Sequence, residues 1–206
     1  MSYCNWKNTS YENLAYHDNE WGIPVCDDIK HFETLSLEAL QCGLNWNIII
    51  KKRPVFRKCF DNFHFDKIAK FTAQDIDKIL QTDGMIKSPQ KIKAIINNAK
   101  CFQALRNEFG HFNNYIWSFS AHKTIIYNNH PQGNIPTSNT FSEKISKDLK
   151  KRGFKYLGAI SIYSYLQACG IINDHDQNCP RFHFINEHYP TIFLPNDNDK
   201  QIQNFR

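Results

Sequence analysis

The chain has 206 residues, 41% of them hydrophobic and 22% charged, so its composition is ordinary for a globular protein and excludes disorder throughout. Lys and Arg outnumber Asp and Glu by 25 to 20, a net charge of +5, which permits a nucleic-acid partner without requiring one. The seven cysteines are scattered along a chain too long to need a disulfide scaffold, and they predict a reduced, cytoplasmic protein with mostly buried thiols.

The sequence shows neither a secretory signal nor a membrane span. Its first twelve residues lack an apolar segment, so they do not resemble a signal peptide. The longest stretch without charge, Tyr156–Ile172, is shorter than the ~20 apolar residues that a bilayer requires. It is expected to be a buried helix.

Apolar spacing predicts helices in the first half of the chain. Residues 30–42 and 46–60 repeat apolar side chains every three to four positions, as one face of a helix requires. Pro54 predicts a kink or a break in the second of these segments. Thr72 is expected to cap a short helix over 73–81, which ends by Gly84.

The next signals also favour helices. Ser88 followed by Pro89 predicts the start of a helix, and an apolar stripe continues it from Ile92 to Leu105. Residues 115–119 suggest one more helical segment. Residues 122–136, rich in Asn, Pro and Gly, are expected to form a loop.

The last predicted helices complete an all-α domain. Thr140 is expected to cap a helix over 141–152, with Glu143 completing a capping box and Gly153 ending the helix. A second helix is expected over 157–169. The tail from Pro180 onward has no assigned role.

Four residues could form a metal site. His175 and Cys179 are one helical turn apart, a common spacing for half of a tetrahedral zinc site. Cys4 and His17 could supply the other half. Such a site would be structural, because four protein ligands leave no position for water. The spacing does not show that residues 4 and 179 meet, and each could be an ordinary Cys or His.

A candidate pocket combines aromatic and acidic residues. The segment Tyr16–Gly22 holds two aromatics, two acids and a His, and Glu38 lies on an otherwise apolar helix eight residues before Trp46. Glu38 could instead face solvent. A carboxylate in a pocket beside an indole would suit a flat, electron-poor, hydrogen-bond-donating ring such as a cationic purine.

Basic residues cluster in two places. The turn from Gly84 to Pro89 leads into a helix bearing Lys91, and a turn between helices presents backbone N–H groups that suit a phosphate. A second cluster runs from Lys147 to Lys155. Each cluster could equally be a solvated helix face.

Taken together, these segments closely resemble the DNA-3-methyladenine glycosylase I family of the helix-hairpin-helix DNA-repair superfamily. The resemblance runs in register from Cys4 to about Pro180 and rests on Tyr16–Gly22 (YHDNEWG), Leu37–Trp46, Lys51–Arg53, Lys91–Ala99, Ile135–Ser138, Leu149–Leu157 (LKKRGFKYL) and Gln167–His175.

The resemblance implies a fold, a domain organisation and a metal. The expected fold is an all-α helix-hairpin-helix glycosylase fold of two helical lobes with the base pocket between them. The domain would span 1–180, followed by a tail over 181–206. One structural Zn²⁺ is expected to join the terminal segments through four ligands: Cys4, His17, His175 and Cys179.

The resemblance also implies the site residues. Glu38 corresponds to the catalytic glutamate at the base edge, Trp46 to the stacking tryptophan and Tyr16 to a pocket tyrosine, while Trp6 and Trp21 match further pocket walls. Leu44 is expected near the gap left in the duplex. The hairpin contacts to DNA are expected from Lys87, Ser88 and Lys91.

The implied activity is excision of 3-methyladenine from alkylated double-stranded DNA in base-excision repair. The base would be flipped out of the duplex and its glycosidic bond hydrolysed. No Asp lies between Asp83 and Asp148, which agrees with the family's lack of the usual catalytic aspartate. No lysine is expected to act as a nucleophile, so the enzyme would have no lyase step. A monomer suffices.

The sequence departs from the family pattern in three places. Asn13 replaces a second pocket tyrosine, Asn45 replaces a serine before the stacking tryptophan, and the hairpin carries fewer basic residues.

Two alternative functions remain open. One alternative is a zinc hydrolase in which Glu20 or Glu38 activates metal-bound water, which would need an open ligand position. The other is a noncatalytic helix-hairpin-helix module that only binds DNA.

Overall fold

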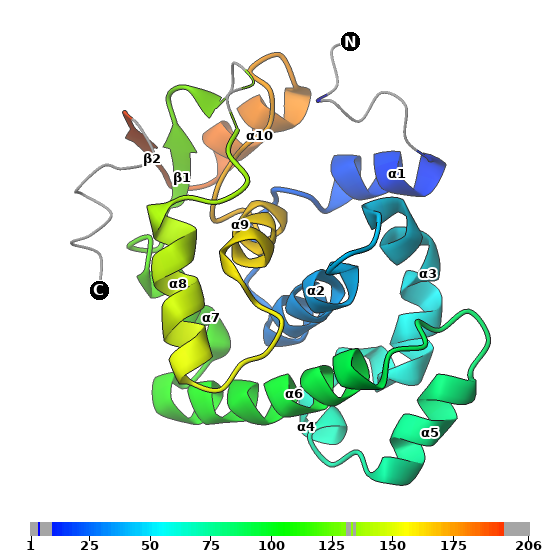
Figure 1. The fold of residues 1–206 in the computed structure, drawn as a ribbon. Coiled ribbons are helices and arrows are strands. Elements are labelled where there is room, and N and C mark those ends of the chain that lie inside the picture. Colours follow the sequence, from blue (N-terminus) through cyan, green and yellow to red (C-terminus); the bar gives the residue numbers. More distant parts are fainter. Residues whose placement is uncertain (1–3, 5–9, 131–132, 134, 196–206) are drawn as a thin grey trace.

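The computed structural model describes residues 4, 10–130, 133 and 135–195, and this part of the chain is mostly helical (Figure 1). The helices are α1 (Tyr11–Asn19), α2 (Asp28–Gln41), α3 (Trp46–Cys59), α4 (Phe65–Ile68), α5 (Ala73–Gln81), α6 (Pro89–Phe109), α7 (Phe112–Ser118), α8 (Thr140–Lys151), α9 (Ala159–Ala168) and α10 (Pro180–His188), with a 3₁₀ turn at Asp61–Phe63. Two short strands, β1 (Thr124–Tyr127) and β2 (Thr191–Leu194), complete the fold.

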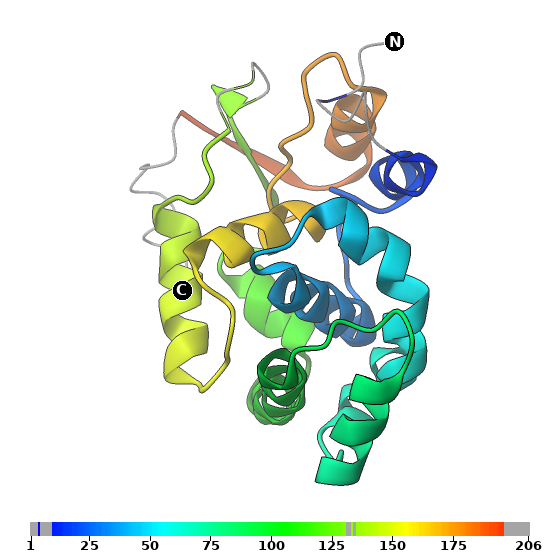
Figure 2. The ribbon, with the colours of Figure 1, turned by 45° about the vertical axis from the view of Figure 1, so that its right-hand side comes forward.

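Helix α2 is the central element, and it packs against α3, α6, α7 and α9 (Figures 1 and 2). Every residue of α2 from His31 to Leu40 is buried. A helix surrounded on all sides is normally apolar all round, yet α2 carries several acids and hydroxyls. The buried polar side chains of α2 therefore need partners or a function.

The cap signals placed several helices correctly. Helix α5 covers the predicted 73–81, with Thr72 and Asp75 forming a capping box. Helix α6 begins at Pro89, with Ser88 as its N-cap. Helix α3 continues through Pro54 without a break. The predicted helices over 30–42 and 157–169 are also confirmed, with ends shifted by one or two residues.

One cap prediction was wrong by a residue. The N-cap of α8 is Asn139, whose side chain accepts from the Ser142 backbone N–H at 2.9 Å, and Ser142 completes the capping box. Thr140 and Glu143 lie inside the helix. Asn caps a helix as well as Ser and better than Thr, so two adjacent candidates competed for one position.

The loop predicted over 122–136 contains strand β1, so that prediction was wrong in part. Strand β1 pairs in parallel with β2, from Thr124 with Thr191 to Tyr127 with Leu194. The unassigned segment after Pro180 contributes α10 and β2. A parallel partner 67 residues away leaves no local turn signal, which explains why the strand was missed.

No helix in the described residues is both long enough and apolar enough to cross a bilayer.

The prediction of mostly buried thiols was wrong. Cys4, Cys169 and Cys179 are buried, Cys26 is exposed, and the other three cysteines are half-buried.

Candidate active site and metal centre

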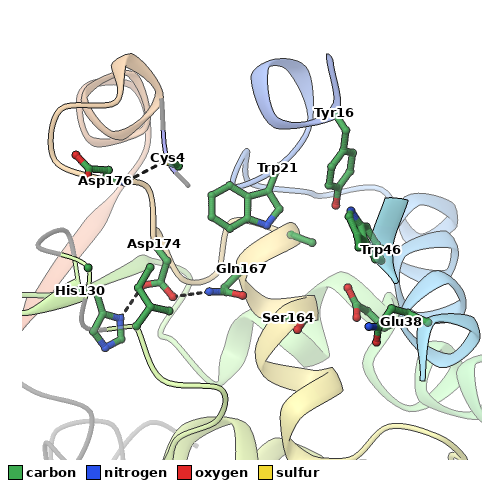
Figure 3. Close-up of a pocket in the computed structure, with 14 residues that line it drawn as sticks. Cys4, Tyr16, Trp21, Glu38, Trp46, His130, Ser164, Gln167, Asp174 and Asp176 are labelled. Carbon is green, nitrogen blue, oxygen red and sulfur yellow. Dashed lines mark hydrogen bonds and ion pairs between the residues drawn. The ribbon is translucent and has the colours of Figure 1, made fainter. Parts of the chain in front are cut away.

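A cavity of about 350 Å³ opens between α1, α2, the start of α3, α9 and the segment after β1 (Figure 3). It is lined by Cys4, Tyr16, Trp21, Glu38, Gln41, Trp46, His130, Gly133, Ile135, Ser164, Gln167, Ala168, Asp174 and Asp176. Four of the predicted pocket residues, Tyr16, Trp21, Glu38 and Trp46, therefore line one cavity. Trp6 lies outside the described residues.

Glu38 is a buried carboxyl group at the wall of this cavity. It lies in the last turn of α2, and only 4% of the residue is exposed. Burial raises the pKa of Glu38 to about 8, and no charged group or hydrogen-bond donor among the described residues offsets that effect. By contrast, His31 on the same helix bonds the hydroxyl of Tyr165 at 2.7 Å. The free protein therefore holds Glu38 protonated at neutral pH.

Tyr16 and Trp46 form an aromatic corner above Glu38 (Figure 3). Their ring centroids lie 5.7 Å apart, and their planes meet at 49°. Burial, and then the charge of Glu38, raises the pKa of Tyr16 well above its usual value, so its hydroxyl keeps its proton. The indole nitrogen of Trp46 is buried and has no hydrogen-bond partner among the described residues. A bound planar ring could satisfy that donor.

The opposite wall of the cavity was missed by the sequence analysis. Asp174 is buried and accepts hydrogen bonds from the Tyr163 hydroxyl at 2.7 Å and from the Gln167 amide at 2.8 Å. His130 Nδ1 lies 2.7 Å from the same carboxylate. These side chains face Glu38 and Trp46 across the cavity (Figure 3). The available signal was that Gln167 and Asp174 lie within the segment Gln167–His175, which carries the resemblance.

The four predicted metal ligands meet in a buried cluster beside the cavity. The ligand atoms of Cys4, His17, His175 and Cys179 all lie within 4.8 Å of one another. His175 Nδ1 lies 3.5 Å from the sulfur of Cys4 and 3.6 Å from that of Cys179. Tetrahedral zinc with two sulfurs and two nitrogens separates ligand atoms by about 3.3–3.8 Å, so these two distances fit the ion.

The groups around the cluster also fit a metal. His17 Nδ1 lies 2.8 Å from the carboxylate of Asp18, and His175 Nε2 lies 3.1 Å from the carbonyl of Trp21. Each contact leaves the other ring nitrogen to face the cluster, as metal-bound histidines require. A Cβ on Gly22 would lie 2.7 Å from His175 Nε2, so only glycine permits this approach.

Trp21 connects the metal cluster to the cavity. Its ring stacks on His17 with a centroid distance of 5.9 Å and meets His175 edge-on at 4.6 Å. The same side chain lines the cavity. The metal cluster therefore supports one cavity wall directly.

Glu20 takes part in an ion network rather than in the metal cluster. Its carboxylate accepts from the Arg53 guanidinium at 2.8 Å and also pairs with Lys30. These two cations lower the pKa of Glu20 against the opposing effect of burial. The carboxylate is thus held as an ion-pair partner, which argues against its use as a base for metal-bound water.

The predicted DNA contacts lie at two sites. Leu44 is half-buried in the loop between α2 and α3. Ser88 caps α6, and the Lys87 ammonium donates to the carbonyls of Leu80 and Thr82 at the end of α5. The Lys91 ammonium donates to carbonyls at the end of α2.

Two of the departures from the family pattern now have a structural setting. Asn45 caps α3 and accepts from the Asn47 backbone N–H at 2.8 Å, and Asn caps a helix about as well as Ser. Asn13 is buried in α1 and is not among the residues that line the cavity.

Comparisons with known proteins agree with this geometry. The chain is 40% identical over 179 residues to DNA-3-methyladenine glycosylase 1 of Escherichia coli, covering 87% of this chain and 96% of that protein. A crystal structure of 3-methyladenine DNA glycosylase I superposes with a TM-score of 0.82 at 40% identity, over 87% of this chain and 98% of that one.

A further crystal structure shows a variant of 3-methyladenine DNA glycosylase I in complex with 3-methyladenine. It has a TM-score of 0.82 and 32% identity, and covers 87% of this chain and 97% of that one. The sequence model described as methyladenine glycosylase matches residues 6–183. The chain belongs to the methyladenine glycosylase family.

Proposed function

We propose that this chain is a base-excision-repair glycosylase that hydrolyses 3-methyladenine from alkylated duplex DNA as a monomer. The proposal rests on the cavity in which the buried carboxyl group of Glu38 lies beside the aromatic corner of Tyr16 and Trp46. No cation among the described residues offsets the effect of burial on this group. The relatives named for this activity match most of this chain, and a variant of one of them was crystallised with 3-methyladenine.

Charge selects the damaged base. Methylation at N3 makes adenine cationic, and a cation offsets the cost of an ionised carboxylate in a dry cavity. Glu38 would accept from the exocyclic amine, Trp46 would stack on the ring, and the Tyr16 hydroxyl would hold one edge. Neutral adenine offers no charge that would favour ionised Glu38, so it would bind more weakly than the cationic base.

The chemistry needs little acid assistance. When the bond between C1′ and N9 breaks, its electron pair neutralises the purine, which leaves as an uncharged base. Water then adds to C1′ and releases its proton to solvent. The protein supplies the energy that extrudes the base from the stack and holds it in the cavity.

We propose a structural Zn²⁺ held by Cys4, His17, His175 and Cys179. The ion would tie α1 to the segment that precedes α10. Its four protein ligands leave no position for a reacting water. This donor set argues for a structural role and against the zinc-hydrolase alternative.

We propose that DNA crosses the surface around the loop 42–45. The sulfur of Cys42 contacts the Tyr156 carbonyl and the Ser161 hydroxyl at 3.6 Å, so this loop lies beside the turn between α8 and α9. Lys147, Lys150 and Lys155 line a recess at that turn. Their charges would hold the phosphate backbone, while Leu44 would fill the gap left by the flipped base.

The test is an assay of bases released from methylated duplex DNA, separated by chromatography. The wild-type chain should release 3-methyladenine, and Glu38→Gln should lower the rate by about tenfold or more. Glu187→Gln, an exposed change on α10, serves as the matched control. DNA binding without base release would instead support the noncatalytic module.

A further inference from the structure

We propose that Arg53 is the positioning residue of the base cavity, an inference that rests on the proposed function. Arg53 lies on α3 and is 7% exposed. It is not among the residues that line the cavity. Any effect of Arg53 on the bound base therefore acts through other side chains.

The Arg53 guanidinium binds two carboxylates with both of its edges. Nη1 and Nη2 each donate to Glu20 at 2.8 Å, and Nε and Nη2 donate to Glu33 at 2.9 and 3.0 Å. Glu20 follows the end of α1, and Glu33 lies on α2. One planar group thus joins α1, α2 and α3.

Each of these three helices supplies one wall of the cavity. Tyr16 lies one helical turn before Glu20, Glu38 lies on α2, and Trp46 lies two turns before Arg53. The guanidinium carbon also lies 5.9 Å from the centroid of the Tyr16 ring, within cation–π range. Lys30 of α2 pairs with the same two carboxylates, but among the described residues of this network only Arg53 ties α3 to both Glu20 and Glu33.

The geometry requires arginine and would not be met by lysine. A lysine has no planar fork and cannot bind two carboxylates with paired bonds. Hydrogen bonds from Arg53 and Arg57 outweigh the effect of burial and lower the pKa of Glu33 to about 2. The network therefore stays charged at neutral pH and keeps its geometry there.

Arg57 provides the matched control. Among the described residues it donates only to Glu33, at 2.7 and 3.2 Å, and its side chain is 45% exposed. It touches the same network, yet it bridges only α3 and α2. A conservative change at Arg57 should therefore leave the aromatic corner in place.

The experiment compares Arg53→Lys with Arg57→Lys by two readouts. The first is kcat/KM for base release, which should fall about tenfold in Arg53→Lys, because small displacements of a binding wall have large effects. The second is the titration of Glu38, followed by carbon NMR of labelled glutamate carboxyl groups and assigned with Glu38→Gln. In Arg53→Lys, Glu38 should titrate about one pH unit or more below wild type, because a displaced wall admits water. Arg57→Lys should match the wild type in both.

Glu20→Gln tests the same point if Arg53→Lys does not fold. It removes the charge that both Arg53 and Lys30 contact at the end of α1 and leaves the buried pair of Arg53 and Glu33, so it should reproduce a smaller form of both changes. A folded Arg53→Lys with an unaltered Glu38 titration and kcat/KM would overturn the proposal, as would lower thermal stability with both readouts intact. If the wild type releases no base, the proposed function fails, and the Glu38 titration still decides the positioning role.

Discussion

The ammonium group of Lys91 donates a hydrogen bond to the backbone carbonyl of Cys42 at 2.6 Å. It also donates to the carbonyl of Leu40 at 2.6 Å, so it satisfies two groups at the end of α2 that the helix leaves unpaired. Lys91 thereby anchors the first residue of the loop that carries Leu44. We infer that it acts on DNA through this loop.

Replacing Lys91 by Met should remove the hydrogen bonds that hold the loop 42–45 to α6. The number of contacts between the protein and DNA phosphates should stay unchanged. We expect a loss of about 1–3 kcal/mol in unfolding free energy and weaker binding to methylated duplex DNA. The slope of log affinity against log salt concentration should stay the same. Lys93→Met, an exposed change on α6, is the control. A slope smaller by about one would show that Lys91 contacts a phosphate directly.

Glu38 should make the fold less stable as pH rises. Its folded pKa of about 8 lies above the usual 4.5, so the folded state holds a proton that the unfolded state loses. The free energy of unfolding should therefore fall between about pH 4.5 and 8 by a few kcal/mol relative to Glu38→Gln. Denaturant titrations at pH 5, 7 and 9 measure the difference. Parallel curves for the two proteins would contradict the burial of an ionisable group at this position.

The activity should rise with pH over the same ionisation. Only the ionised form of Glu38 compensates a cationic base, so kcat/KM should increase to a plateau above about pH 8. Glu38→Gln should be less active and lack this transition. An identical profile in both proteins would assign the transition to another group.

Removal of the proposed zinc should destabilise the fold and the cavity together. We expect metal analysis to find one zinc per chain, and a strong chelator to lower the unfolding free energy by several kcal/mol. Cys179→Ser should mimic the chelator, whereas Cys101→Ser, at a half-buried cysteine outside the cluster, should not. Purified protein without metal and with unchanged stability in chelator would contradict the site.

The sequence predicted those elements whose signals are local. Helices α5 and α6 were placed closely because Thr72, Ser88 and Pro89 set their ends. Strand β1 was missed because four residues that pair with a distant strand carry no periodic signal of their own. The residues proposed for the metal site were correctly grouped, since the structure brings all four together.

The parts of the site that the sequence did not predict are long-range polar contacts. Arg53 was one of three basic residues in a row, and only the fold shows that it meets Glu20 and Glu33. Lys91 was predicted to contact DNA, and nothing in the sequence indicated that its ammonium also donates to the backbone at the end of α2. Pairings of this kind depend on how helices cross, which the spacing of residues along one helix does not specify.

The parallel pairing of β1 with β2 and the meeting of Cys4 with Cys179 have a consequence during translation. Strand β1 pairs with residues 67 positions later in the chain, and Cys4 meets a cysteine 175 positions later. Helices α3, α6 and α7 can pack against α2 before those later segments are synthesised. The wall formed by Tyr16 and Trp21 lacks the contact with His175 and the cluster completed by Cys179 until these two residues have left the exit tunnel, so a nascent chain would expose an incomplete cavity.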